Sequence, residues 1–504
     1  MYSFPPIPLP FIVPPVHRLT RWALLLASSL ALCGCLGLKD PPHSSAVALS
    51  ANQLETKISL ADTRVSALSW PPEQWWQSFK DPQLEQLIEE ALQKNPSLKI
   101  AEARVNKANA YVQSIQSISR SQIQVAGQIT QERFSGKGSI PPPFAGSKNT
   151  AAGLQSNLNL DPDFWGKNLA LYQSALDQSH AIQMDVLSAK LALCVQITGT
   201  YLQFAQAHQE LDLARHSLIL QQDILVLSKA RWEAGIDSEL VLKPIESSIA
   251  QWRRQMAQYA QLIDLYAHQL AALVGVGPDR TANLKVPHLT FTTSLEIPSQ
   301  IPAELLGRRP DILALRWRIE AAQNEVTAAK KLFYPNVNLN AFLGFQSIGL
   351  PGFLQNRSLT YGAGPAVTLP IFDGGRIRAN LSDRQADLDI WVEQYNEAVI
   401  NALREVVDQL SAFRHLTEAI KQLQLSYQAT DATRHLAQIR FQEGIGNQLE
   451  VFNIQTQLLN QQFTQLELAT QQAQLSVNLA RALGGGFETN KAALVPQASS
   501  ASSP

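Results

Sequence analysis

Residues 231–236 read RWEAGI, and residues 440–445 read RFQEGI, 209 positions later in the chain. A constant offset of this kind indicates an internal repeat. Two more pairs keep it, namely Gly166-Lys167 with Gly375-Arg376 and Leu270-Ala271 with Leu479-Ala480. Towards the N-terminus it shifts slightly, since Pro96 aligns with Pro310 at an offset of 214. We therefore expect a tandem duplication, each copy holding a helix, a β-hairpin and two long helices joined at a tip.

The helical segments are unusually long. Helical periodicity extends over 81–118, 164–275, 311–332 and 376–484, with interruptions near Gly235 and Gly444. The part from 164 to 234 alone would measure roughly 105 Å at 1.5 Å per residue. Mainly apolar residues at alternating spacings of three and four predict coiled-coil seams. They are Leu242, Ile245, Ile249, Trp252, Met256, Tyr259, Ile263, Tyr266, Leu270 and Leu273, then Leu449, Phe452, Thr456, Leu459, Phe463, Leu466, Thr470, Ala473, Val477 and Ala480.

Four segments between the helices carry strand signals. Residues 122–129 and 337–345 alternate with period two, and 151–160 and 361–369 are their partners. Each is about 10 residues, the length of a transmembrane β-strand. Four strands cannot close a barrel in lipid, because open edges leave backbone groups unpaired. The chain must therefore pool strands with copies of itself if it spans a membrane; otherwise these are two soluble hairpins.

The N-terminus predicts an export signal. A basic stretch at 17–21 precedes an apolar run at 22–32, which is too short to span a membrane as a helix. Leu32 and Gly34 before Cys35 resemble a bacterial lipobox, so we expect cleavage after residue 34 and lipidation of Cys35. An ordinary secretory signal with two incidental cysteines is the alternative. No later segment is expected to span a membrane as a helix.

Composition excludes several classes of protein. The 504 residues are 45% hydrophobic and 16% charged, against roughly 25% charged in an ordinary globular domain. The net charge of −1 argues against nucleic-acid binding, and three cysteines exclude a disulfide scaffold. Mean hydropathy is −0.08, which is too low for a polytopic helical membrane protein. Such low charge fits a protomer whose surfaces are covered by lipid and by neighbouring copies.

We expect no catalytic centre, cofactor or metal ion. The sequence has no phosphate-cradling glycine motif. His208 and His216 are read as polar residues on helix faces rather than as metal ligands. Asp161 and Asp163 are read as a strand-to-helix junction rather than a catalytic pair. The charges at 308–311 are read as a helix-start cluster rather than a basic substrate site.

Several stretches resemble the TolC-type outer-membrane efflux channels, specifically their lipoprotein (NodT-like) branch. The match covers about 70–484, and its motifs stand in family order. They are WWQSFKDPQL at 75–84 with Leu92 and Asn95-Pro96, RRPDI at 308–312 with Ala328-Ala329 and Phe333-Tyr334-Pro335, GPAVTLPIFDGGR at 364–376, and the two glycine-centred tips.

The resemblance implies a mainly α fold with a transmembrane β part. Three tandem-repeat protomers of long coiled-coil helices and two β-hairpins would form a 12-stranded β-barrel continued by a 12-helix α-barrel. We divide the chain into a lipoprotein signal peptide (1–34), a lipidated extended lead or equatorial segment (35–80), a first repeat (81–275), an equatorial linker (276–302), a second repeat (303–484) and a disordered tail (485–504). The hairpins are expected at 120–160 and 335–371, with tips near 235 and 444.

The resemblance also implies a function and partners. The homotrimer would be a passive exit duct in the outer membrane, lipid-anchored and extending into the periplasm. It would contact outer-membrane lipid, a periplasmic adaptor (membrane fusion) protein and an inner-membrane pump of the resistance-nodulation-division type, with no nucleic acid. Two alternatives remain: an exit duct for peptide or protein (type I) secretion, and a periplasmic coiled-coil lipoprotein acting as scaffold or adaptor.

Two groups of residues carry the implied function. The tips resemble the helix ends that meet the adaptor, although a plain interhelical turn is the alternative; their residues are Gly235, Ile236, Asp237, Gly444, Ile445 and Gly446. Leu449 matches a leucine that narrows the family's periplasmic gate. Asn453 stands where an aspartate is common, and Thr456 where an arginine is common. Pro244 occupies the matching position of the first repeat. Because neither position carries an aspartate, we expect closure to rely on the apolar ring of Leu449 and on amide hydrogen bonds of Asn453, and to be less sensitive to pH and cations.

Overall fold

The computed structural model describes residues 46–49, 70–287 and 307–487. The expected signal peptide, the lipidation candidate Cys35, most of the expected lead and linker, and the tail beyond residue 487 lie outside these ranges. The chain divides into two compact units. The strand unit contains Ile118–Ala170 and Glu325–Asp389, and the helical unit contains Ala46–Ser117, Leu171–Asn324 and the chain from Ile390 onward.

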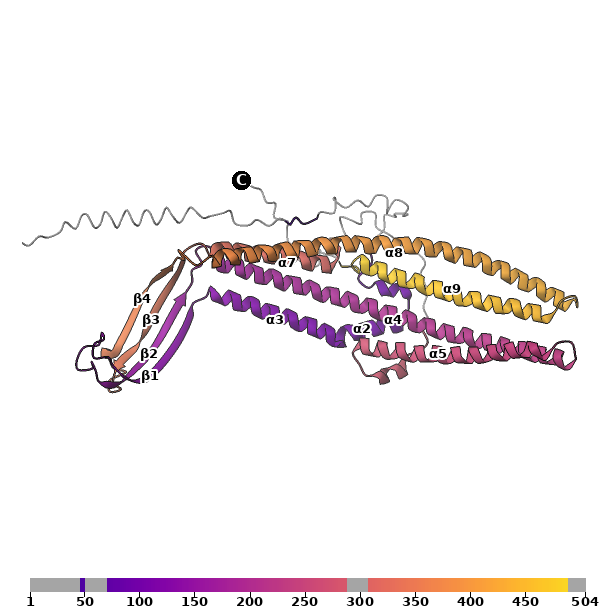
Figure 1. Ribbon diagram of the computed structural model, residues 1–504, viewed down its shortest axis with the longest axis horizontal. Helices are drawn as coiled ribbons and strands as arrows, with labels where there is room; N and C mark the ends of the chain where they lie inside the picture. The colour runs from indigo at the N-terminus through magenta and orange to yellow at the C-terminus, as the bar shows by residue number, and fades with distance from the viewer. Residues whose placement is uncertain (1–45, 50–69, 288–306, 488–504) are drawn as a thin grey trace, which may run out of the picture. The chain divides into compact units, whose positions relative to one another are not determined.

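The strand unit is built on one antiparallel sheet (Figure 1). Its strands are β1 (Gln122–Arg133), β2 (Lys148–Leu160), β3 (Asn336–Ile348) and β4 (Leu359–Thr368), in the order β1-β2-β3-β4. The two predicted hairpins are confirmed. In addition, the hairpins pair with each other through β2 and β3, so Leu154 lies opposite Phe345. The edges of the sheet are β1 and β4.

The two faces of the sheet have opposite chemistry. Side chains alternate between faces along a strand, and the register keeps like residues together across all four strands. One face holds the apolar side chains Ile123, Val125, Ile129, Leu154, Leu158, Leu160, Val337, Leu339, Leu343, Phe345, Tyr361 and Val367. The other holds the polar side chains Gln122, Gln124, Gln128, Gln155, Asn157, Asn159, Asn336, Asn338, Asn340, Thr360 and Thr368.

Phe342 is an aromatic exception on the polar face. It lies opposite Gly362 in the register of β3 and β4. A Cβ atom at Gly362 would lie 2.7 Å from the Phe342 ring, so the ring occupies the space that a larger residue would need. Apart from this pair, amides and hydroxyls dominate the face. A sheet this polar on one side and this apolar on the other suits water on one side and lipid on the other.

Long helices carry most of the chain. Within the described ranges they are α2 (Pro82–Lys94), α3 (Pro96–Ile118), α4 (Lys167–Glu233), α5 (Leu242–Val274), α7 (Pro310–Lys331), α8 (Arg376–Gln442) and α9 (Gln448–Ala482). Both α4 and α8 have 67 residues, which corresponds to about 100 Å. Figure 1 shows α4 joined to α5, and α8 joined to α9, as two hairpins. The predicted seam residues of α5 and α9 are buried or half-buried.

The expected continuous helix over 81–118 is interrupted. Asn95 adopts an extended conformation (φ −60°, ψ 124°) between α2 and α3. The following Pro96 disfavours helical geometry at the residue before it. The Asn95 side chain then accepts a hydrogen bond from the Ser97 N–H at 2.8 Å and so begins the next helix.

A buried hydrogen bond fixes the start of α2 in the core of the helical unit. Asp81 Oδ1 accepts from the Gln83 N–H at 2.9 Å, which makes Asp81 the N-cap of α2, with Pro82 after it. Asp81 Oδ2 accepts from the Tyr201 hydroxyl of α4 at 2.8 Å. Tyr201 is fully buried. The first helix and the first long hairpin are therefore joined by a polar contact inside an apolar cluster that includes Trp75, Leu84 and Ile197.

One described helix differs from expectation in its hydropathy. An 18-residue window of α4 reaches a mean hydropathy of 1.3 and is long and apolar enough to cross a membrane by length and composition alone. The expectation that no segment after the leader would reach this level is wrong. The same helix supplies Ile197, Tyr201 and Leu202 to the core. In this structure 39% of the window is buried, and a helix that is apolar around its circumference is suited to packing on several sides.

Candidate functional site: the two tips and the start of α9

The first tip is a tight helix-ending turn. Gly235 has φ +73°, which a side chain would disfavour. Its N–H donates to the Trp232 carbonyl at 2.9 Å, and the Ile236 N–H donates to the Arg231 carbonyl at 2.9 Å. This pair of bonds is the Schellman motif, which satisfies the last carbonyls of a helix. The Ser238 hydroxyl oxygen then accepts from the Leu240 N–H at 3.3 Å and starts the return path.

The second tip repeats that turn. Gly444 has φ +74°, its N–H donates to the Phe441 carbonyl at 3.0 Å, and the Ile445 N–H donates to the Arg440 carbonyl at 3.0 Å. Asn447 caps α9 by accepting from the Leu449 N–H at 3.0 Å. The predicted glycine turns are thus observed at both ends, with a polar cap after each.

Side chains distinguish the two tips. Arg231 forms a double hydrogen bond with Asp237, from Nε to Oδ2 at 2.6 Å and from Nη2 to Oδ1 at 3.1 Å. Position 446 of the second tip, equivalent to Asp237, is a glycine. A Cβ there would lie 2.8 Å from the Phe441 backbone nitrogen, so the chain passes too close for a side chain. Arg440 instead approaches Glu450 of α9 at 3.5 Å.

Each tip exposes an isoleucine. Ile236 is 64% exposed and Ile445 is 72% exposed. Single exposed apolar residues are ordinary on protein surfaces. Here they stand at equivalent positions of two turns, and each follows a glycine that fixes the backbone. Each tip therefore presents one exposed isoleucine. Ile236 is followed by Asp237, which is paired with Arg231, whereas Ile445 is followed by Gly446.

The predicted gate residues lie on the first turns of α9. Leu449 is half-buried and Asn453 is exposed. Residues three and four apart share a helix face, so Leu449, Asn453 and Thr456 lie along one side of α9. The Thr456 hydroxyl donates to the Phe452 carbonyl of the same helix at 3.0 Å. Pro244, the first-repeat counterpart of Asn453, lies in the first turn of α5.

The charged junctions have structural roles. Asp163 accepts from the Asn168 and Leu169 N–H groups at 3.0 and 2.8 Å and so caps α4, as the reading of a strand-to-helix junction predicts. At the start of α7, Arg309 donates to Asp311 at 2.7 Å and to Glu405 at 2.9 Å. Arg309 is 9% exposed, which favours the helix-start cluster over a substrate site.

His208 and His216 of α4 make contacts typical of helix-face residues. The His208 ring packs edge-on against Phe204, with centroids 4.7 Å apart, and the exposed His216 lies 3.6 Å from Asp212 of its own helix. Across the described ranges, no three His, Cys, Asp or Glu residues are grouped as metal ligands would be.

Sequence reasoning missed the contrast between the tips. The signal was available in the repeat itself, because an offset of 209 places Gly446 on Asp237. A glycine at the position of Asp237 leaves Arg440 without the carboxylate that pairs with Arg231, and this difference alone predicts the contrast. The role of Asn447 as a helix cap was also missed, although asparagine is among the preferred N-cap residues.

The chain is similar to proteins of known family over most of its length. A family model described as outer membrane efflux protein matches residues 87–276 and 301–485. The fusaric acid resistance protein FusA of Burkholderia cepacia is 33% identical over 378 residues, which cover 74% of this chain and 70% of that protein. The multidrug resistance outer membrane protein MdtP of Escherichia coli (strain K12) is 27% identical over 485 residues, 94% of this chain and 98% of that protein.

Solved structures share the fold. The outer membrane protein VceC from Vibrio cholerae is 32% identical and superposes with a TM-score of 0.76 over 83% of this chain and 100% of that chain. The CmeC outer membrane channel of Campylobacter jejuni, at 21% identity, gives a TM-score of 0.77 over 86% of this chain and 92% of that chain; at that identity it supports the fold alone.

Proposed function

The chain belongs to the outer membrane efflux protein family, and we propose that three copies form the exit duct of a tripartite pump that exports drugs or other small molecules. It is an outer-membrane efflux channel with the fold of that family. Transport energy comes from the pump, so this chain performs no catalysis.

One observation supports the trimer above the others. The four-stranded sheet has an apolar and a polar face and two open edges, β1 and β4. Backbone groups on open edges cannot stay unpaired in lipid. Pairing β1 of one copy with β4 of the next removes both edges, and three copies give a closed barrel of 12 strands. The apolar face would then meet lipid, and the amide-rich face would line a wet lumen.

The trimer has a direct test. The full chain is expressed with its own leader, outer membranes are separated, and unheated and heated samples are compared on SDS gels. We expect an SDS-resistant trimer in the outer-membrane fraction that becomes a monomer on heating. A monomer released from membranes by high salt would overturn the duct and favour a periplasmic scaffold or adaptor lipoprotein.

Lipidation of Cys35 anchors each protomer in this proposal. The lipobox-like sequence before Cys35 supports it. Intact-mass analysis of the mature chain and of Cys35→Ser separates the possibilities. We expect acyl mass on the wild type alone, with a mature chain that begins at Cys35. An unmodified wild-type N-terminus would leave only an ordinary secretory signal.

The tips dock the periplasmic adaptor in this proposal, and the adaptor connects them to a resistance-nodulation-division pump. The support is the pair of exposed isoleucines, held by matching turns at the ends of both long hairpins. Docking is tested by site-specific crosslinking from position 236 or 445 in cells that express the adaptor. Position 425 on α8, which is exposed and lies between the tips in the chain, is the control.

Closure near the tips is assigned to Leu449, Asn453 and Thr456. The exposed amide of Asn453 and the shared face of the three residues support this. A leucine ring blocks ions by dewetting, whereas an aspartate ring binds cations. The amide at position 453 therefore gives a gate that relies on the apolar ring and depends little on divalent cations.

Small molecules are favoured over secreted proteins as cargo. The relatives are named for fusaric acid resistance and for multidrug resistance, which is the single observation that separates the two duct functions. Deleting the gene in its own host should increase accumulation of small drugs. If drug accumulation is unchanged while an extracellular peptide or protein disappears from the medium, the type I secretion duct is the correct function.

A further inference from the structure

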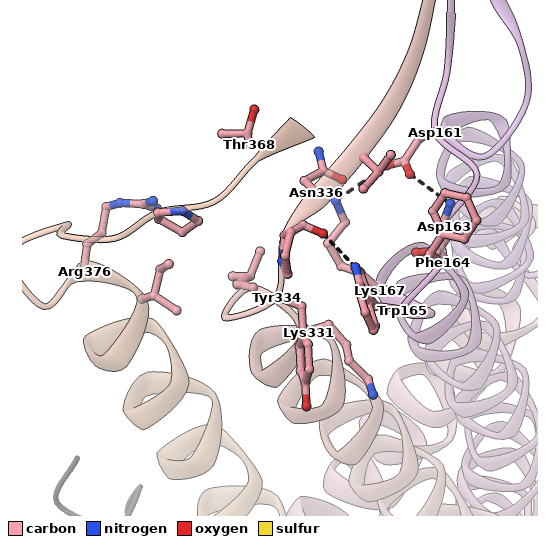
Figure 2. A pocket seen from close by; sticks show the side chains of 15 residues that line it. Asp161, Asp163, Phe164, Trp165, Lys167, Lys331, Tyr334, Asn336, Thr368 and Arg376 are labelled. Carbon is pink, nitrogen blue, oxygen red and sulfur yellow. Dashed lines mark hydrogen bonds and ion pairs between the residues drawn. The ribbon is translucent and has the colours of Figure 1, made fainter. Parts of the chain in front are cut away.

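A pocket of about 260 Å³ lies where the central strands of the sheet meet their helices. It is formed after the end of β2 and before the start of β3, together with the end of β4 and the starts of α4 and α8 (Figure 2). All its residues belong to the strand unit. Because β2 and β3 are not edge strands, their part of the pocket lies away from the edges that the proposed trimer would pair.

A stacked aromatic pair forms the middle of this pocket. The rings of Trp165 and Tyr334 lie 5.1 Å apart with an angle of 25° between their planes. The indole Nε1 of Trp165 donates to the Pro335 carbonyl at 2.7 Å, which fixes the ring in place. The Lys331 Nζ lies 5.6 Å from the centre of the Tyr334 ring. Amphipathic rings of this kind are typical of membrane–water interfaces.

Cations from three helices line the pocket. Lys167 begins α4, Lys331 ends α7 and Arg376 begins α8. Among the residues described, neither Lys331 nor Arg376 takes part in an ion pair, and the Lys167 Nζ is 3.8 Å from Asp161. Figure 2 shows these three side chains on different sides of the aromatic pair. The pocket can therefore surround an anionic group that carries more than one oxygen.

The two carboxylates in the pocket are already engaged. Asp163 accepts from two N–H groups of α4 at 2.8 and 3.0 Å. Asp161 accepts from the Asp163 N–H at 3.0 Å and from the Asn168 amide at 2.9 Å. Their charge compensates the helix start and is directed mainly at backbone and amide groups. Asp161 also lies 3.8 Å from the Lys167 Nζ, so Lys331 and Arg376 are the cations that remain available to a ligand.

An apolar rim continues from the pocket. Phe164 is 68% exposed, and Ile371 and Phe372 are each 92% exposed. Phe164 follows the end of β2 and lines the pocket, and Ile371 and Phe372 follow Pro370, a lining residue just after β4. Large exposed apolar residues in such numbers mark a surface that meets lipid or a partner. The rim and the basic pocket together fit one molecule that has both an apolar and an anionic part.

We propose that this pocket binds the headgroup of an anionic phospholipid, with its acyl chains along the apolar face of the sheet. The phosphodiester would accept from Lys331, Arg376 and Lys167, and the Trp165–Tyr334 pair would support the glycerol region. This inference rests on the outer-membrane location of the channel. A free phosphate ion would use the same cations but would gain nothing from the rim.

The test measures lipid preference on the intact, purified channel. Delipidated protein is titrated with phosphatidylglycerol and, separately, with phosphatidylcholine, and bound lipid is counted by native mass spectrometry. One basic residue near an anionic headgroup contributes about fivefold in binding. We expect wild-type protein to prefer phosphatidylglycerol by that factor or more, with one lipid per protomer. Lys331→Gln with Arg376→Gln should strongly reduce the preference, because only Lys167 remains, and Lys331→Arg should keep it.

Controls separate this inference from the proposed duct. Lys229→Gln with Lys421→Gln removes two exposed lysines of the long helices and should leave the preference intact. Equal binding of both lipids by wild-type protein would overturn the inference, as would a preference that the double substitution leaves unchanged. Displacement of the lipid by millimolar inorganic phosphate would assign the pocket to a free anion instead. Single-channel conductance of the same samples tests the duct, whether or not lipid is bound.

Discussion

Arg231 and Asp237 form a closed ion pair across the first tip, with bonds of 2.6 and 3.1 Å between guanidinium and carboxylate. A two-bond arginine–carboxylate pair adds geometric specificity to its charge. The hydrogen bond from Arg231 holds the pKa of Asp237 below its ordinary value. The pair is therefore intact above that ordinary value and is lost only as pH falls through the lowered pKa. Near neutral pH, the first tip stays locked.

Removing the Asp237 charge should loosen only the first tip. In Asp237→Asn, the amide hydrogens around 235–238 should exchange faster, since local opening no longer breaks the ion pair. Exchange around 444–447 should be unchanged. Glu450→Gln is the matched control, because its 3.5 Å contact with Arg440 is long and exposed. Equal protection of the first tip in wild type and Asp237→Asn would show that the glycine turn alone holds it.

Restoring the acidic residue at position 453 should create a cation-sensitive gate. In planar bilayers, wild-type channels should show weak block by divalent cations at the periplasmic side. Asn453→Asp places one carboxylate per protomer near the constriction and should produce block at lower cation concentration. Asn460→Asp, an exposed position farther along α9, is the control. Strong block of the wild type would contradict the amide gate.

Shortening the proposed apolar ring should open the resting channel. Leu449→Ser replaces a half-buried leucine by a small polar residue, so water can enter the constriction more easily. We expect cells that express it to become sensitive to vancomycin, which ordinary outer membranes exclude. Leu425→Ser, at an exposed position of α8, should leave sensitivity unchanged. Unchanged sensitivity in Leu449→Ser at normal expression would place the constriction elsewhere.

Local sequence patterns predicted the turns and the strands correctly, because neighbouring residues determine these features. Glycine at 235 and 444 marks the tips because only a few residues tolerate positive φ, and period-two alternation marks the strands. The pairing of β2 with β3 depends instead on residues that are far apart in the chain. Leu154 and Phe345 face each other across 191 positions of chain, and alternation alone fixes faces without naming partners. The interruption at Asn95 was missed because helical periodicity continues on both sides of Pro96.

The pocket around Trp165 and Tyr334 could not be predicted from local sequence patterns either. Lys167, Lys331 and Arg376 lie in three separate segments, and each reads alone as an ordinary helix-end charge. Trp165 and Tyr334 are 169 positions apart and stack only because β2 and β3 are neighbours. The sequence contained the residues of this pocket, but the pairing of the two repeats was needed to bring them together.

The hydrogen bond between Tyr201 and Asp81 should be measurable in stability. Tyr201→Phe keeps the ring in its fully buried position and removes the hydroxyl that donates to Asp81 at 2.8 Å. The loss of such a bond to a buried charged group costs about 1–3 kcal/mol. We expect a lower apparent melting temperature of the SDS-resistant form. Tyr111→Phe, at an exposed position of α3, should melt as the wild type does; equal melting of both variants would contradict the role of Tyr201.

Asp177 of α4 should make the helical unit more stable in mild acid. Burial raises its pKa to about 6, although a hydrogen bond from Asn324 at 2.8 Å favours the ionised form and the nearby Glu320 opposes it. The folded chain thus holds a proton that the unfolded chain releases near its ordinary pKa of 3.8. Stability contributed by this group therefore rises as pH falls through about 6.

Asp177→Asn should remove that pH dependence. The apparent melting temperature of the wild type should rise between neutral pH and pH near 5, and the variant should rise less while melting higher at neutral pH. Part of the dependence of melting temperature on pH should remain in the variant, because burial also raises the pKa of Glu320. Asp223→Asn changes an exposed carboxylate on the same helix and should keep the full slope. If Asp177→Asn keeps it as well, the carboxylate is solvated in the assembled channel and carries no proton on folding.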